Sequence, residues 1–179
     1  MEATATKTKW GIDITHSEVQ FKVKHLIIST VTGSFKTFDG SLETENDNFD
    51  GGAVTLDVDV NSIDTNQVDR DNHLRSADFF NVEEFPKMTF NGSLQKKEDA
   101  RFELSGSLTI KGTTKELTLA VEYGGTMVDG YGQTKAGFEV EGKINRKDFG
   151  LTWSMVTEAG GVVVGDDIKL LFNVQFTKA

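Results

Sequence analysis

The sequence contains no cysteine and only one proline, Pro86. A chain without cysteine forms no disulfides, builds no thiolate zinc site and has no thiol nucleophile. It has no apolar run as long as a transmembrane segment, and its first residues, MEATATKTKWG, lack the apolar stretch of a signal peptide. As written, the sequence predicts a cytoplasmic protein. A periplasmic or secreted protein from which a signal peptide had been removed would have the same pattern.

Positive charge is also scarce. Lysine and arginine number 19 against 28 aspartates and glutamates, which gives a formal net charge of −9 at pH 7. Nucleic-acid binding depends on clustered basic side chains that contact phosphates, and attraction to anionic membrane surfaces depends on the same charges. We therefore expect no nucleic-acid partner and no electrostatic attachment to a membrane.

Alternation of apolar and polar residues with a period of two dominates the chain and is typical of antiparallel strands with one buried face. Turn-forming residues separate the alternating segments. The expected strands are 19–25, 31–42, 54–60, 88–94, 102–110, 117–123, 136–144 and 168–176. No linker or fixed-period repeat divides them, so we expect one domain over residues 1–179, with 1–9 as a loose N-terminal extension.

The expected strand over residues 31–42 changes its inward parity. Phe35 and the apolar residues before it share one parity, whereas Phe38 and Leu42 share the other. A shift of one residue turns every side chain of a strand to the opposite face, so both sets can point inward only if the strand is interrupted. We expect a β-bulge near residues 36 and 37.

Residues 63–86 depart from the alternating pattern and have helical or irregular character. Asn66 is a candidate helix N-cap, and Asp71 precedes Arg75 at the spacing of a helical ion pair. A parallel sheet would need many such crossovers, whereas this chain has one. The expected fold class is all-β: an eight-stranded antiparallel, lipocalin-like barrel with a short helical insertion between strands.

Glycines on the inward parity indicate whether this barrel is filled or holds one small ligand. They are Gly33, Gly40, Gly92, Gly106 and Gly142. A single such glycine is equally well explained by a bend in the barrel, but five together, beside phenylalanines, favour an apolar cavity. Such a cavity suits a long hydrocarbon chain. Gly106→Phe is then expected to lower lipid capacity while leaving the barrel folded.

A set of short motifs follows in a fixed order from about Trp10 to Phe176. The motifs are DITHS (13–17), FKVKH (21–25), VTGSF (31–35), FDGSL (38–42), SI (62–63), RDNHLRS (70–76), DFF (78–80), FP (85–86), TF (89–90), GSLTIKG (106–112) and NRKDFG (145–150). In this order they resemble the YceI-like family of bacterial, lipocalin-like proteins. The resemblance implies a barrel around an apolar tunnel that holds a polyprenyl or quinone-like chain, often in a homodimer and often in an exported protein.

The function expected from these observations is binding, and sequestration or transport, of an isoprenoid-type lipid without catalysis. The residues expected to contact the lipid are Phe21, Val23, His25, Phe35, Phe38, Phe79, Phe90, Leu104, Leu119, Phe138, Val140 and Phe172. His25 would be the polar group at one end of the tunnel. No cofactor other than the bound lipid is expected.

The polar cluster Arg70, Asp71, His73 and Arg75 has two interpretations. In the first, these side chains hydrogen-bond helix ends and strand edges and tie the insertion to the barrel, as buried polar groups usually do. In the second, they form a polar rim that contacts the head group of the ligand.

Two rival functional classes remain. A hydrolase could use the Asp71 and His73 region, but the sequence has no GxSxG motif and no cysteine.

The spacing of His16, His25 and His73 matches no zinc signature, so no metal site is expected. The other alternative is a barrel with a filled core that serves as a protein-interaction or stress-response module.

Overall fold

Antiparallel strands make up most of the protein in its computed structural model, which describes residues 7–26, 28–45, 48–153 and 164–179. In chain order the strands are β1 (Thr8–Ile12), β2 (Glu18–His25), β3 (Ser29–Phe35), β4 (Phe38–Thr44), β5 (Ala53–Asp59), β6 (Ile63–Asp64), β7 (Lys87–Glu98), β8 (Arg101–Ile110), β9 (Thr113–Val128), β10 (Thr134–Asn145) and β11 (Val164–Lys178). Between them lie helix α1 (Val68–Arg75) and the 3-10 helices η1 (Ile14–His16), η2 (Val60–Ser62) and η3 (Arg146–Phe149). Within these ranges, no helix has the length and apolar character needed to cross a membrane.

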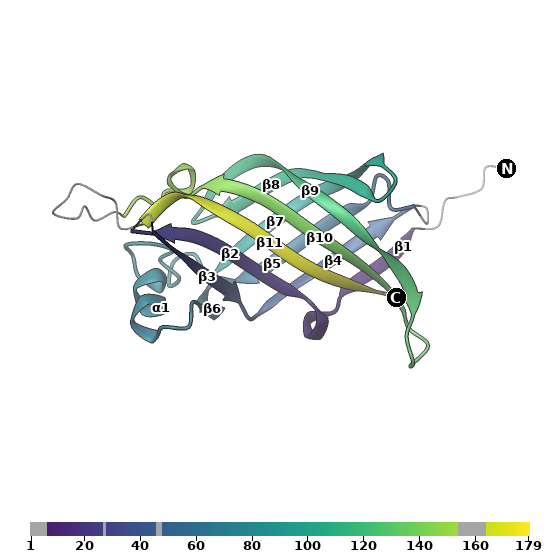
Figure 1. Cartoon of the computed structure of the whole chain (residues 1–179), viewed down its shortest axis with the longest axis horizontal. Coiled ribbons are helices and arrows are strands. Elements are labelled where there is room, and N and C mark those ends of the chain that lie inside the picture. Colours follow the sequence, from purple (N-terminus) through teal and green to yellow (C-terminus); the bar gives the residue numbers. More distant parts are fainter. Residues whose placement is uncertain (1–6, 27, 46–47, 154–163) are drawn as a thin grey trace.

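The strands close into an antiparallel barrel with eight strand positions (Figure 1). Strand β11 pairs with β10 on one side and with both β1 and β2 on the other, so β1 and β2 share one position. In the same way, β3 pairs with β2 while β4 pairs with β1 and β5. The predicted all-β barrel with one short helical insertion is therefore confirmed.

Strand β1 was not expected from the sequence. It begins at Thr8 and pairs with β4 and β11. The expectation of a loose extension over residues 1–9 is thus wrong for Thr8 and Lys9, which belong to the barrel, while residues 1–6 lie outside the described ranges.

The predicted interruption separates β3 from β4 at Lys36 and Thr37. Phe35 and Phe38, on either side of it, are both buried, as the change of parity predicts. Ser62, in η2, accepts hydrogen bonds from the backbone of the two residues in the interruption. Its carbonyl accepts one from the Lys36 N–H at 3.2 Å, and its hydroxyl accepts one from the Thr37 N–H at 3.0 Å. The expected β-bulge is therefore not found: the chain forms two separate strands, and η2 fills the gap between them.

Strand β1 lies toward the end of the barrel opposite α1 (Figure 1). There Trp10, of β1, belongs to an aromatic cluster with Phe49, Tyr123 and Phe138, which closes this end. The ring centroid of Phe49 lies 5.4 Å from that of Trp10 and 5.3 Å from those of Tyr123 and Phe138. Phe49 is only 2% exposed, although its backbone has a φ of +64°, which bulky residues rarely adopt. Burial of the ring offsets this strain, and the cluster leaves the α1 end as the place where the interior can open.

Candidate binding cavity

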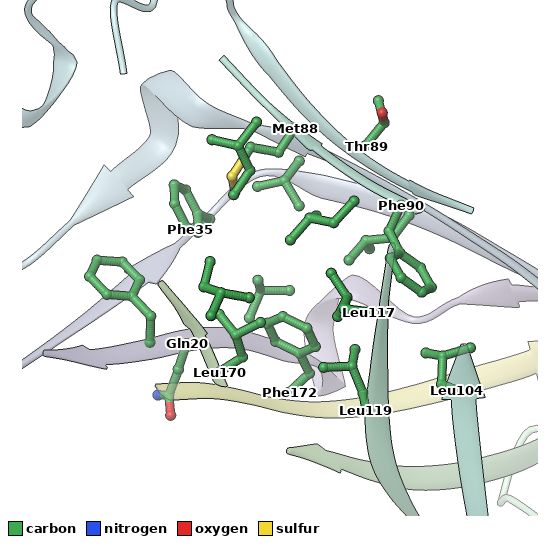
Figure 2. A pocket seen from close by; sticks show the side chains of 17 residues that line it. Gln20, Phe35, Met88, Thr89, Phe90, Leu104, Leu117, Leu119, Leu170 and Phe172 are labelled. Carbon is green, nitrogen blue, oxygen red and sulfur yellow. The ribbon is translucent and has the colours of Figure 1, made fainter. Parts of the chain in front are cut away.

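A cavity of about 80 Å³ lies inside the barrel, and its walls are apolar (Figure 2). Side chains from β3, β7, β8, β9 and β11 point into it, among them Phe35, Met88, Phe90, Leu104, Leu117, Leu119, Leu170 and Phe172. We call this space the inner cavity. Its lining offers a ligand dispersion contacts and almost no hydrogen bonds.

Two further spaces continue from the inner cavity toward α1. An intermediate cavity of about 100 Å³ shares Phe21, Phe35 and Met88 with the inner cavity. A mouth pocket of about 330 Å³ shares Phe21 and Phe79 with the intermediate cavity and is also lined by polar residues of β2 and α1. The three spaces therefore form a row that begins in the apolar interior and ends at a mainly apolar mouth bordered by polar residues.

The inward glycines were expected to leave empty volume inside the barrel, and the structure shows a different role for them. A methyl group on Gly33 would collide with the ring of Phe21, and one on Gly142 would collide with Leu119. The space over each glycine is thus already occupied, so the idea that glycines leave empty volume is wrong at these positions. Because Phe21 and Leu119 both line the inner cavity, the glycines instead let these side chains lie against the wall.

Gly92 and Gly106 face each other directly on β7 and β8. A Cβ on Gly106 would collide with the backbone of Asn91 and Gly92, which cannot move aside as a side chain can. Gly106→Phe is therefore expected to strain the sheet, which corrects the expectation that this variant would only fill the cavity.

The residues expected to contact lipid fall into three groups. Those that line the inner cavity are Phe21, Phe35, Phe90, Leu104, Leu119 and Phe172. Val23 and Phe79 line the intermediate cavity and the mouth pocket, and His25 lines the mouth pocket. Phe38, Phe138 and Val140 are buried in the packed core and line none of the three spaces. Contact of any of them with a ligand stays a prediction.

Some lining residues were not singled out from the sequence. Leu170 and Ile144 lie on the inward parity of their strands, so the alternating pattern could have identified them. Leu74, on α1, and Trp153, after η3, carry no such signal. Their positions depend on how the insertion and the chain after η3 pack against the barrel.

Thr65 connects two members of the predicted polar cluster. Asp71 is 7% exposed and accepts hydrogen bonds from the backbone N–H and the hydroxyl of Thr65. Arg70 donates from Nε to Thr65 Oγ1 at 2.8 Å and from Nη2 to the Thr65 carbonyl at 2.6 Å. The cluster therefore ties the start of α1 to the chain before it, and it fixes the direction of the Arg70 side chain.

Arg75 supports the structural interpretation. Its Nε donates to the Asn61 carbonyl and its Nη2 to the Ile63 carbonyl, both at 2.9 Å, so it ties α1 to η2 and β6. The expected helical ion pair with Asp71 is not formed, because Thr65 binds that carboxylate instead. The expected N-cap at Asn66 is also wrong, because the Gln67 side chain caps α1.

His73 lies at the mouth pocket and not beside Asp71. Its Nε2 is 2.9 Å from Asp78 Oδ2, and its ring centroid lies 4.7 Å from Trp153 and 5.1 Å from Phe79 in edge-to-face contacts. Asp71 and His73 thus have separate partners and do not form the pair that a hydrolase would need.

Arg146 organises the chain after β10. Its side chain is 3% exposed and donates to the carbonyls of Leu151, Trp153 and Gly165 at 2.6, 2.8 and 2.9 Å. Burial lowers the pKa of this guanidinium, and Asp166, at 3.6 Å, opposes the shift. Arg146 thereby positions Trp153 at the mouth pocket, a role that the sequence did not indicate.

The histidines lie at separate elements: His16 on η1, His25 at the end of β2 and His73 on α1. Across the described ranges, no three His, Asp or Glu side chains converge on a point where they could hold a metal ion.

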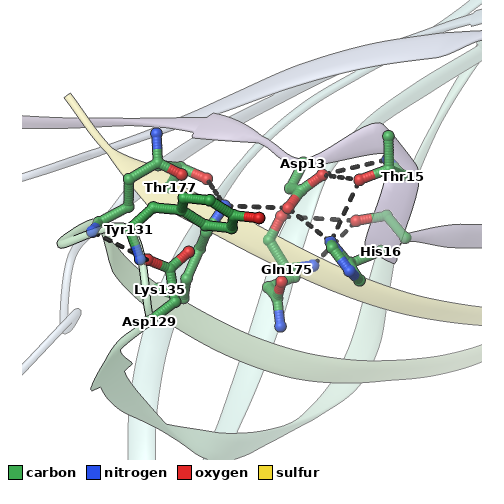
Figure 3. A network of polar contacts seen from close by, with 10 residues as sticks. Asp13, Thr15, His16, Asp129, Tyr131, Lys135, Gln175 and Thr177 are labelled. Carbon is green, nitrogen blue, oxygen red and sulfur yellow. Dashed lines mark hydrogen bonds and ion pairs between the residues drawn. The ribbon is translucent and has the colours of Figure 1, made fainter.

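A second polar network lies where β1 passes into β2 (Figure 3). Asp13 Oδ2 is 2.9 Å from both Lys135 Nζ and His16 Nδ1, and Lys135 also donates to Thr177 at 2.6 Å. Hydrogen bonds from Thr15, followed by those from His16 and Lys135, hold the pKa of Asp13 well below its usual range. The network joins η1 to β10 and β11 and so stabilises the closure of the barrel.

A closed antiparallel barrel whose apolar interior opens at one end defines a lipocalin-like protein. The family model described as a YceI-like domain matches residues 10–176, and the chain belongs to this family.

Relatives match along almost the whole chain. The chain is 42% identical over 171 residues to a UPF0312 protein of Staphylococcus epidermidis, covering 95% of this chain and 98% of the relative. It is similar to the YceI protein of Campylobacter jejuni, with a TM-score of 0.73, 31% identity and coverage of 99% of this chain and 98% of that one. It also shares the fold of a polyisoprenoid-binding domain from Saccharophagus degradans, with a TM-score of 0.69, 18% identity and coverage of 95% and 98%.

Proposed function

We propose that the protein binds a long, apolar, isoprenoid-type lipid inside the barrel, and that it sequesters or carries this lipid without catalysing a reaction on it. The observation that carries the proposal is the row of apolar spaces, which is closed at the Phe49 end and leads to the mouth pocket beside α1. Each Å² of hydrocarbon removed from water there contributes roughly 25 cal/mol, so few hydrogen bonds are needed. The similar fold of a polyisoprenoid-binding domain supports the same ligand class.

Binding of a long chain requires the interior to widen. The inner and intermediate cavities measure about 80 and 100 Å³, below the roughly 300 to 1,000 Å³ of common ligand pockets. Phe21 and Met88 are among the side chains that line both cavities, and an unbranched Met side chain changes rotamer easily. We infer that an entering chain displaces these two side chains and joins the cavities into one tunnel.

The same small volumes favour the alternative of a filled barrel that binds a protein partner. Uptake of a polyprenol from dilute dispersion, measured as moles bound per mole of protein, separates the two functions. The lipid proposal predicts saturation at a fixed stoichiometry, whereas the filled-barrel alternative predicts no saturable uptake. Assembly as a homodimer is a further part of the proposal, tested by sedimentation with and without lipid.

A further inference from the structure

Three lysines lie side by side on the outer face of three neighbouring strands, β10, β11 and β2 (Figure 1). Lys143 is the direct cross-strand partner of Lys169, and Lys169 is the direct partner of Lys22. All three side chains are exposed, and we call them the lysine row. Like charges directly opposite each other in an antiparallel sheet are destabilising, so the row is unfavourable in the unbound protein. An anionic partner would relieve this repulsion.

Few carboxylates neutralise the lysine row. Lys143 pairs with Asp167 at 3.2 Å, but neither Lys22 nor Lys169 forms an ion pair with any residue in the described ranges. Lys24, the next exposed residue of β2, is likewise without an ion pair in that part of the chain. The wall formed by these strands therefore carries a local excess of positive charge toward its α1 end.

Two exposed apolar side chains follow directly after β2. Leu26 is 40% exposed, and Ile28, between β2 and β3, is 88% exposed. They lie at the α1 end of the barrel, because His25 and Val31, at the adjoining parts of β2 and β3, line the mouth pocket together with residues of α1. Proteins that bind the surface of a bilayer combine insertion of apolar side chains with attraction of lysines to anionic lipids. Both elements are present here next to each other.

Most of the negative charge lies elsewhere on the protein. The expectation of no electrostatic attachment to a membrane came from the net charge of −9. At physiological ionic strength exposed charges are largely screened beyond roughly 8 Å, so the local distribution decides. Asp69 and Glu83 are exposed on the insertion between β6 and β7, and Glu139 and Glu141 precede Lys143 on β10, on the side away from α1. A bilayer can therefore approach the lysine row without facing the insertion.

We propose that the lysine row, together with Leu26 and Ile28, forms a docking surface for an anionic lipid bilayer. In this orientation the wall of β2, β10 and β11 faces the bilayer, and the acidic side of the insertion points away from it. The role of the surface rests on the proposed function, because docking brings the mouth pocket beside the membrane. A lipid that is insoluble in water then passes between the bilayer and the barrel without crossing the solvent.

Co-sedimentation with vesicles tests the charge contribution. The vesicles contain no isoprenoid and consist of phosphatidylcholine alone or of phosphatidylcholine with phosphatidylglycerol. We expect the wild type to bind the anionic vesicles roughly tenfold or more tightly than the neutral ones. Lys22→Gln with Lys169→Gln should weaken this binding roughly twentyfold. The matched control is Lys9→Gln with Lys178→Gln, which removes two exposed lysines at the opposite end of the barrel and should leave binding unchanged.

A second pair of variants tests the apolar contribution and the orientation. Ile28→Ser should weaken binding to anionic vesicles by roughly tenfold, because the side chain no longer gains from leaving water. Met127→Ser is the control, since Met127 is 66% exposed near the far end of β9. Loss of binding in Met127→Ser and not in Ile28→Ser would assign docking to the β9–β10 end and overturn the proposal.

Uptake of a polyprenol from a vesicle-free dispersion, measured on the same proteins, separates docking from lipid binding. Uptake without vesicle binding overturns the docking surface and leaves the proposed function standing. Lysine-dependent vesicle binding without uptake supports the docking surface and overturns the proposed function. Equal losses in the two double-lysine variants overturn the role of the lysine row, and so does lysine-dependent self-association in place of vesicle binding, which assigns the row to a second copy of the chain. If the Lys22 and Lys169 variant does not fold, wild-type binding that fails to weaken at high salt overturns the proposal.

Discussion

The ring of Phe21 lies against Gly33 on the neighbouring strand, in the position that a side chain at residue 33 would occupy. Leu119 covers Gly142 in the same way, between β9 and β10. In both cases the glycine has no Cβ, and this leaves room for the large neighbouring side chain to lie against the barrel wall. Capacity of the inner cavity therefore depends on pairs of residues and not on glycine alone.

Gly33→Ala is expected to push Phe21 toward the axis and to reduce lipid uptake. Overpacking of this kind typically costs about 1–3 kcal/mol, so the variant should fold with lower stability. Uptake stoichiometry and chemical denaturation measure the two effects. Gly137→Ala is the matched control, because a Cβ there meets no atom within 4 Å. Unchanged uptake in a folded Gly33→Ala protein would contradict the role assigned to the pair.

Phe49→Ala is expected to open the closed end of the barrel. Loss of the buried ring should cost about 3–5 kcal/mol. If the variant stays folded, it should accept longer isoprenoid chains than the wild type does. Competition between isoprenoids of different lengths measures this change. An identical length preference in both proteins would show that the aromatic cluster does not set the limit.

Asp71→Asn is expected to loosen α1 while leaving the barrel intact. The substitution removes the charge that binds Thr65, and a lost charge-assisted hydrogen bond costs about 1.5–3 kcal/mol. Hydrogen exchange should become faster in α1 and around residue 65, with unchanged protection in β8 to β10. Asp69→Asn, which alters an exposed carboxylate on the same helix, is the control. Equal protection of α1 in all three proteins would refute this structural role.

The Asp13 network predicts how stability depends on pH. The pKa of Asp13 is lower in the folded protein than its ordinary value of 3.8, so its contribution is fully present above that value and is lost as the pH falls below it. Asp13→Asn should therefore be less stable than the wild type at pH 7, and the difference should shrink on acidification below about pH 4. Denaturation from pH 7 to pH 2 measures it, with Asp57→Asn, exposed on β5, as the control. A difference that stays constant down to pH 2 would contradict the assignment.

The barrel could be predicted from the sequence because its signal is local. Period-two alternation marks each long strand, and the change of parity between Phe35 and Phe38 marks the gap before β4. Strand β1 is short, and its pairing with β4 and β11 depends on barrel closure, which no local pattern encodes.

The site was less predictable, for physical reasons that differ between residues. The sequence shows which inward positions are glycine and so have no Cβ, but it does not show that Phe21 fills the space over Gly33. Phe49 stands among polar residues in the sequence, and neither its burial nor its left-handed backbone has a signal in the alternating pattern. Asp71 could pair with Arg75 by spacing, but the fold brings Thr65 to it instead.

The most direct test of the central claim is native mass spectrometry of freshly purified protein, before and after incubation with a mixture of polyprenols, prenyl phosphates and isoprenoid quinones. The account predicts one lipid per chain, which organic extraction releases and identifies as an isoprenoid. A bare protein mass in both samples, from a protein that is folded by circular dichroism, would contradict the lipid-binding function and favour the filled barrel.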